Sequence, residues 1–299
     1  MSRYSPYSTS SPPIPPTNST ALLLIDNQLG FRSTAHFGEQ FSNPDYETNI
    51  TALLSAFRAI IDNTSPDLRP HIIHVQHKAV WTDSPMHPSH VGPYGINGEE
   101  KRGIDFLEFA APRLVRDGKL EFVYTFDEPP PPTAEQRGQQ AKKNDAKNQS
   151  NEFIMTKHGQ SVFINTPLQQ ILDKKGIKTL LIAGMATDGA VSTAVRMAHN
   201  LGLMGKWGGK GNVADASKSA LWTDGAGMYV TEEECKPLEG EDAVDGYLVD
   251  MPRIVLISDA TRTFGKNGIE ADVVHGVHVE SLREYAEVRR TEEILGALK

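Results

Sequence analysis

Cysteine is almost absent from this chain, which has 299 residues and a single cysteine, Cys235. One thiol cannot form an internal disulfide, so nothing in the sequence indicates an oxidising compartment. Cys235 also directly follows three glutamates, and their negative charge disfavours a thiolate. We therefore do not expect Cys235 to be a nucleophile.

Long apolar runs and an excess of positive charge are also lacking. No apolar stretch approaches the length that spans a bilayer, and the N-terminus has no apolar signal core. Lys and Arg number 30 against 38 Asp and Glu, which gives a net charge of −8 and a pI near 5.7. The basic residues are scattered, so we expect no membrane segment, no nucleic-acid partner and a cytoplasmic location.

What is present suits one enlarged domain. The hydrophobic content of 38% is enough for a large core. Residues 1–18 are rich in Ser and Pro, and we predict a disordered tail there, followed by a single domain over residues 19–299. Two insertions are expected near residues 126–151 and 203–250. The second follows a predicted helix, and we expect it to shape a homo-oligomer interface or to reach the pocket of a neighbouring subunit.

The chain is organised around residues 178–202. An apolar run over residues 180–183 predicts a buried strand, residues 184–189 form a turn of small residues, and a helix is expected from about Ala190 to Ala198. A strand that feeds a helix through such a turn leaves free backbone N–H groups at the helix start, where an anionic oxygen can bind. The turn is therefore a candidate site of chemistry.

Two charged residues end other predicted strands. Asp26 follows the apolar run at residues 21–25, and Lys157 ends the run at residues 153–157. Residues at the C-terminal ends of parallel strands converge on the crevice where the strand order reverses. Asp26, Lys157 and the turn are therefore expected to share one pocket.

Further candidates for substrate contact lie just after predicted strands or in the long loop at residues 78–103: Gln28, Phe31, His77, Trp81 and Arg262. Three histidines in the predicted strand at residues 71–77 could suggest a metal site. Alternation along a strand sends His74 to the face opposite His71 and His77, so we predict no metal and no cofactor.

At these residues the chain resembles the isochorismatase-like hydrolase superfamily. The resemblance is carried by four segments: residues 21–28, residues 157–163, the stretch from Gly176 to Asp188, and residues 258–260. It implies an α/β, Rossmann-like fold with a doubly wound, mostly parallel six-stranded sheet and helices on both faces. It also implies a departure, because amidases of the superfamily carry a nucleophilic cysteine two residues after the Asp of the turn, and that position here is Ala190.

The same resemblance implies roles for the site residues. Asp26 and Lys157 match the catalytic acid and lysine, and the turn residues Met185, Ala186 and Thr187 match the segment that binds oxygen. It further implies a cis peptide between Met185 and Ala186, with the N–H groups of Ala186 and Ala190 aimed into the pocket.

Three functions remain open for a chain with alanine at the nucleophile position. The leading hypothesis is a cysteine-independent hydrolase of a small carboxylated or enol-ether metabolite, in which Asp26 is the general acid and Lys157 assists. The chain could instead be a Cys-to-Ala form of a thiol amidase. A third hypothesis is a non-catalytic binding protein of enzyme descent.

Overall fold

The core of the computed structural model is one six-stranded sheet. The structure describes residues 13–116, 119–122, 151–212, 222–223, 226–227, 243–244 and 247–298. The sheet has the spatial order β15-β14-β8-β1-β2-β7, and every neighbouring pair is parallel. Its strands are β1 (Thr20–Ile25), β2 (His71–His77), β7 (Glu152–Lys157), β8 (Thr179–Met185), β14 (Arg253–Arg262) and β15 (Glu287–Arg289).

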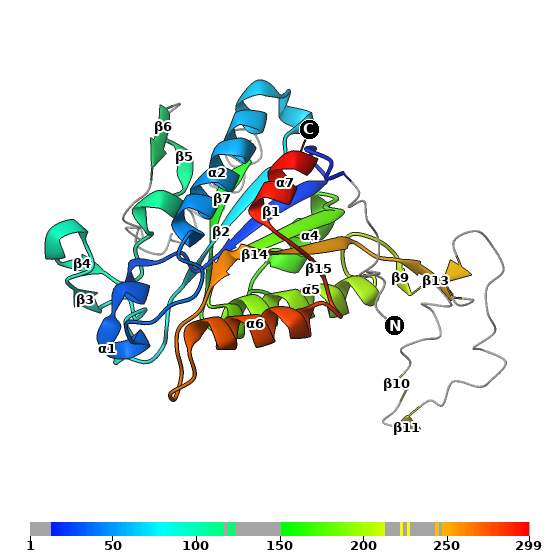
Figure 1. The fold of residues 1–299 in the computed structure, drawn as a ribbon. Coiled ribbons are helices and arrows are strands. Elements are labelled where there is room, and N and C mark those ends of the chain that lie inside the picture. The colour runs from blue at the N-terminus through cyan, green and yellow to red at the C-terminus, as the bar shows by residue number, and fades with distance from the viewer. Residues whose placement is uncertain are drawn as a thin grey trace.

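Helices cover both faces of this sheet (Figure 1). One face carries α2 (Tyr46–Asn63) and α7 (Thr291–Ala297), and the other carries α4 (Leu168–Lys174), α5 (Ser192–Leu203) and α6 (Ala271–Leu282). Side chains of β1 alternate between the two cores, with Leu23 and Ile25 in one and Leu22 and Leu24 in the other. A strand buried on both faces reads as a continuous apolar run, as β1 does.

The strand order defines where a site can form. Counted along the chain, the order is 3-2-1-4-5-6, in which the connections change direction between β1 and β8. This is the doubly wound arrangement whose crevice lies at the C-terminal ends of the two strands at the switch point. The predicted fold class is confirmed.

Smaller elements surround the sheet. They are the short helix α1 (Thr34–Phe37) and the strands β3 (Val91–Gly92), β4 (Lys101–Arg102), β5 (Arg113–Arg116), β6 (Lys119–Phe122), β9 (Gly211–Asn212), β10 (Trp222–Thr223), β11 (Ala226–Gly227), β12 (Ala243–Val244) and β13 (Tyr247–Asp250). Short 3-10 turns lie at Leu29–Arg32, Pro66–Leu68, Ile96–Gly98 and Glu108–Ala110.

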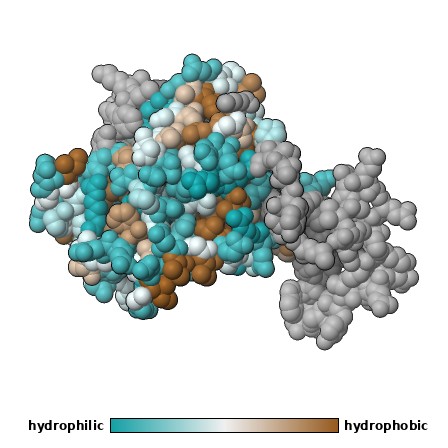
Figure 2. Space-filling model, viewed as in Figure 1, coloured by the Kyte–Doolittle hydropathy of each residue, from teal (hydrophilic) through white to brown (hydrophobic). Residues whose placement is uncertain are grey.

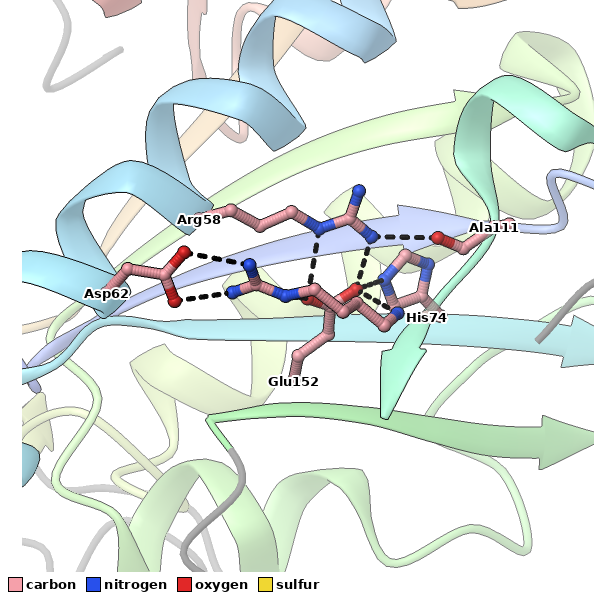
Figure 3. Close-up of polar contacts among 6 residues, drawn as sticks. Arg58, Asp62, His74, Ala111 and Glu152 are labelled. Carbon is pink, nitrogen blue, oxygen red and sulfur yellow. Dashed lines mark hydrogen bonds and ion pairs between the residues drawn. The ribbon is translucent and has the colours of Figure 1, made fainter. Parts of the chain in front are cut away.

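A buried carboxylate joins β5 to the sheet (Figure 3). Glu152, the first residue of β7, accepts hydrogen bonds from Arg58 on α2 (2.5 Å), from the backbone N–H of Arg113 (2.7 Å) and from His74 (3.0 Å). Arg113 also forms two hydrogen bonds with Asp62. Glu152 therefore holds α2, β2 and β5 together at the edge strand.

The end of the predicted tail is packed onto the domain. Residues 1–12 lie outside the described residues, but Ile14 is fully buried and its N–H donates to Ala297 O at 3.1 Å. Arg253 donates to Pro13 O at 2.8 Å. Ile14 therefore supplies an apolar contact with the domain that the Pro-rich composition does not reveal.

Both predicted insertions fall largely outside the described residues. At the start of the second, Trp207 is fully buried and its indole N–H donates to Ala198 O at 3.1 Å. Trp207 is thus part of the main core. Within the described residues, no helix is both long and apolar enough to cross a bilayer.

Candidate active site

Asp26 and Lys157 meet at the C-terminal edge of the sheet. Lys157 Nζ lies 2.7 Å from Asp26 Oδ2, and both side chains are buried. Nζ also donates to Gly159 O at 3.1 Å. The two residues end strands that are separated by β2, so the long lysine side chain bridges the strand between them.

Burial dominates the titration of Asp26. Loss of hydration raises the pKa of this carboxyl from 3.8 to about 6, although the charge and hydrogen bond of Lys157 act in the opposite direction. The second oxygen, Oδ1, is buried and has no hydrogen-bond partner among the described residues. A carboxyl in this state can hold a proton near neutral pH and give it to a neighbouring molecule.

The turn after β8 lies beside Asp26 because two strands approach closely. Gly184 pairs in register with Ile25, the residue before Asp26. A Cβ on Gly184 would lie 2.1 Å from Ile25 O, and the φ of Gly184 is 125°. Only glycine fits both restraints, and the residues after Gly184 therefore begin next to Asp26.

The turn is held from within and from α6. The Met185–Ala186 peptide is cis, as the resemblance implies. Ala186 O accepts from the N–H groups of Gly189 (3.0 Å) and Val191 (3.2 Å), in a single wide π-helical turn over Thr187–Val191. Thr187 is fully buried, and its hydroxyl lies 3.0 Å from Nδ1 of His275 on α6. Such π-helical turns recur at functional sites.

Asp188 links the turn to the segment after β14. Its carboxylate accepts hydrogen bonds from Thr263 and Lys266. Burial raises the pKa of Asp188, but these two bonds outweigh burial and hold the pKa below its usual value. Asp188 is therefore a charged anchor between the turn and the segment after β14.

Ala190 lies inside this turn and is 3% exposed. Its side chain belongs to the apolar core that also contains Ile25 and Val191. The position that would carry a sulfur in a thiol amidase therefore carries a buried methyl group.

His77 ends β2 and pairs in register with Lys157. Burial, together with the charges of Lys157 and His158, lowers the pKa of His77 to about 4, so the ring is neutral at pH 7. Its Nδ1 atom is buried without a hydrogen-bond partner among the described residues. His77, one of the residues predicted to contact substrate, therefore lies beside Lys157.

Gln28 and Phe31 are occupied within the protein. Gln28 Nε2 donates to His77 O (2.8 Å) and Ile104 O (3.0 Å), and its Oε1 accepts from His77 N (2.7 Å). The ring of Phe31 packs on Phe37 and Phe264, with centroids 4.8 and 5.7 Å away.

The other two predicted substrate contacts are Trp81 and Arg262. Trp81 is 74% exposed, so most of its side chain is in solvent. Arg262 donates to Ser42 O (3.2 Å) and Asn43 O (3.1 Å), and its guanidinium lies over the Phe41 ring at 4.3 Å. These contacts differ from the predicted anion contact, because the guanidinium is used on backbone carbonyls and an aromatic face.

Sequence reasoning missed the residues that support the site. His275 contacts Thr187 across 88 positions of sequence, and Tyr46 on α2 donates to Asn27 at 2.5 Å. No local pattern marks either pair. Among the residues that the structure describes, no group of three or more His, Cys, Asp or Glu is arranged to hold a metal ion.

The fold and the site together define a doubly wound α/β protein with a buried carboxyl–ammonium pair at the switch point. Comparison with known proteins agrees with this class. The model of the family described as "Isochorismatase domain" matches residues 20–204. This match spans more than half of the chain, so the chain belongs to the isochorismatase family and is an isochorismatase-like hydrolase.

Solved structures share the fold at low identity. A hydrolase of the isochorismatase family from Chromobacterium violaceum is 21% identical with a TM-score of 0.56, covering 97% of this chain and 98% of that one. A cysteine hydrolase from Pseudomonas syringae pv. phaseolicola is 16% identical with a TM-score of 0.52 and the same coverage. An isochorismatase from Pseudomonas putida is 18% identical with a TM-score of 0.50, covering 95% and 94%.

Proposed function

We propose that this protein hydrolyses a small carboxylated or enol-ether metabolite without a thiol, with Asp26 as the general acid. The observation that supports this proposal is the buried Asp26–Lys157 pair, 2.7 Å apart, next to a turn in which Ala190 offers only a methyl group. An amide needs a strong nucleophile for attack. A vinyl ether needs an acid first, and a buried carboxyl can supply it.

The reaction consumes one water molecule, and the Asp26 carboxyl group gives up a proton and takes one back. Asp26 gives its proton to the methylene carbon of the C=C–O unit, and the electron pair of the double bond forms the new C–H bond. Water adds to the resulting oxocarbenium carbon and returns a proton to Asp26. The hemiketal then loses the C–O bond as its hydroxyl proton moves to the departing oxygen, which leaves a ketone and an alcohol.

The roles of the two Asp26 oxygens follow from their contacts. Oδ2 is bonded to Lys157, whereas Oδ1 has no partner among the described residues, so Oδ1 is the atom that would carry the proton. Lys157 would fix the orientation of the carboxyl group and offer a remaining N–H to a substrate carboxylate. The N–H groups of Ala186 and Ala190 would bind substrate oxygen.

Burial and missing hydrogen-bond partners also support the proposed contacts with the substrate. His77 would contact the substrate as a neutral hydrogen-bonding group, since its Nδ1 is buried and unpartnered among the described residues. Phe31 and Trp81 would contribute aromatic surface if the substrate reaches the segments that carry them.

The direct test is Asp26→Asn, which keeps the shape of the side chain but cannot cycle a proton. With isochorismate as the probe, pyruvate release should fall by at least about a hundredfold, within the range typical of general acid catalysis. Unchanged release with an intact fold would contradict the proposal. Asp62→Asn, at a half-exposed carboxylate in an ion pair with Arg113, is the matched control and should leave release unchanged.

The Ala190 methyl group also supports a second candidate, a Cys-to-Ala form of a thiol amidase, because such a form has the same side chain at this position. Ala190→Cys separates the two. Gain of amide hydrolysis, with no vinyl-ether hydrolysis in the unchanged chain, would favour the amidase. Absence of turnover in both proteins, with binding to partners through residues 203–250, would favour a non-catalytic binding protein.

A further inference from the structure

The side chain of Gln28 connects three segments next to Asp26. Its amide forms a pair of hydrogen bonds with the backbone of His77 at the end of β2, at 2.8 and 2.7 Å. Its second Nε2 hydrogen goes to Ile104 O at 3.0 Å. Gln28 is fully buried, and its own backbone N–H donates to Asp26 O at 2.8 Å.

These bonds act on a residue with an uncommon backbone. Asp26 has a φ of 52°, in the left-handed region that a non-glycine residue enters at a cost of about 1–2 kcal/mol. The N–H of Asp26 donates to Val75 O at 3.1 Å and so extends the hydrogen bonding between β1 and β2. The chain must then turn away from the strand direction. A conformation of this kind persists when the surrounding structure over-determines it.

A stretch from a distant part of the chain runs beside the same residues. Leu29 N–H donates to Asp105 O (2.8 Å), and Leu107 N–H donates to Asn27 O (3.0 Å). Gln28 and Phe106 form a β-bridge between the two stretches. Gln28 therefore sits where the segment after β1, the end of β2 and residues 103–107 meet.

We propose that Gln28 is a positioning residue that holds Asp26 in its left-handed conformation and so aims the carboxyl at Lys157, rather than a residue that contacts substrate. The catalytic part of this inference rests on the proposed function. Both hydrogens and the oxygen of the Gln28 amide are bonded to backbone groups, so the polar atoms of this side chain are used within the protein. Loss of these bonds would let Asp26 relax, and a displacement of about 1 Å at a reacting group can cost on the order of a hundredfold in rate.

Gln76 provides a matched control. It is also fully buried, lies on β2 and donates to the same Ile104 carbonyl at 2.8 Å. Gln28→Met and Gln76→Met thus each remove a buried amide that bonds Ile104 O, but only Gln28→Met removes the bonds beside Asp26. Gln28→Glu is a second variant of nearly unchanged size that replaces the donor group by an acceptor.

The first measurement is pyruvate release from isochorismate. In Gln28→Met, kcat should fall by at least about tenfold, with KM within about threefold of the unchanged chain, and Gln76→Met should keep kcat within about threefold. If Gln28→Met does not fold, Gln28→Glu must show the same fall in kcat. A rise in KM with unchanged kcat, or equal losses in the Gln28 and Gln76 variants, would overturn the inference.

The second measurement does not depend on turnover. Titration of the Asp26 carboxyl carbon by NMR should give a higher pKa in Gln28→Met than in the unchanged chain, because a displaced carboxyl loses the Lys157 contact that lowers it. Gln76→Met should leave that pKa unchanged. If the protein without substitutions hydrolyses no vinyl ether, the proposed function is wrong. Independently of that result, an Asp26 pKa that is the same in Gln28→Met as in the protein without substitutions would overturn the positioning role.

Discussion

Burial favours the protonated form of Asp26, and with the proposed acid role this gives the sign of the pH dependence. Its pKa is raised to about 6, and the proposed reaction needs the protonated form. About nine-tenths of the carboxyl is protonated at pH 5 and about one-hundredth at pH 8, by the ordinary titration relation. We expect kcat/KM for isochorismate to be flat below about pH 6 and to fall about tenfold for each pH unit well above it.

A pH series of initial pyruvate-release rates checks this expectation. A rate that rises through pH 6 would show that Asp26 acts as a base and would contradict the proposed acid role. Lys157→Met removes the cation that lowers the Asp26 pKa, so in that variant the falling limb should move to higher pH.

The location of residues at strand ends could be predicted from the sequence, whereas hydrogen bonds from side chains to backbone groups could not. Asp26 and Lys157 follow apolar runs, and the parallel-sheet rule then brings them together. Gln28 also follows the first strand, but its partners are backbone atoms of His77 and Ile104, which no pattern near Gln28 identifies. The partners of Arg262 could not be predicted for the same reason, since they are carbonyls of residues 42–44.

At the scale of elements, Glu152 is the residue on which the edge strand depends. Removing one partner of a buried ionic network leaves uncompensated charge, which costs about 3–5 kcal/mol. We expect Glu152→Gln to lower the free energy of unfolding at pH 7 by about 3 kcal/mol. Asp62→Asn, at a half-exposed partner of the same Arg113, should cost less than about 1 kcal/mol.

The pH dependence of this loss has a definite direction. Burial raises the pKa of Glu152, but hydrogen bonds and charges from His74 and Arg58 outweigh burial and lower the pKa from 4.5 to about 2. The stabilisation is therefore complete above about pH 4.5 and is lost as the pH falls through about 2. Urea unfolding of both proteins between pH 7 and pH 2 checks this, and a difference that grows toward low pH would contradict it.

Elements with continuous apolar runs were the most predictable part of the chain. The runs that become β1, β8 and β14 are each long enough to specify a strand buried on both faces. The helix after β8 starts later than predicted, at Ser192, because residues Thr187–Val191 form a wide turn first. Nothing in the residue types of that turn distinguishes it from the first turn of an α-helix.

At the scale of the molecule, residues 13–18 connect the body of the protein to its last helix, α7. Ile14 is fully buried in the core beside Ile294 of α7. Ile14→Ala should lower the free energy of unfolding by about 2–4 kcal/mol, as for other buried aliphatic truncations. Ile269→Ala, at a side chain that is 52% exposed, is the control and should change it by less than about 0.5 kcal/mol. Equal effects in thermal or urea unfolding would show that the segment does not contribute.

The assembly state remains a prediction. The view in Figure 2 shows hydrophobic side chains along its lower edge, where α6 lies in Figure 1. Val273 and Val277 on that helix are 53% and 64% exposed. Exposed apolar side chains on a helix are compatible with the predicted homo-oligomer.

The Glu152 network also has a consequence for protein engineering. Phe122 pairs with Arg113 in the β5–β6 hairpin, and Arg113 N–H is bonded to Glu152, so Phe122 and Glu152 lie close to each other. Closing a longer or shorter connection between such neighbouring points changes the entropy only slightly. A fluorescent reporter or a short glycine–serine linker could therefore be inserted between Phe122 and Asn151 while the strand pairing of the parallel sheet is kept.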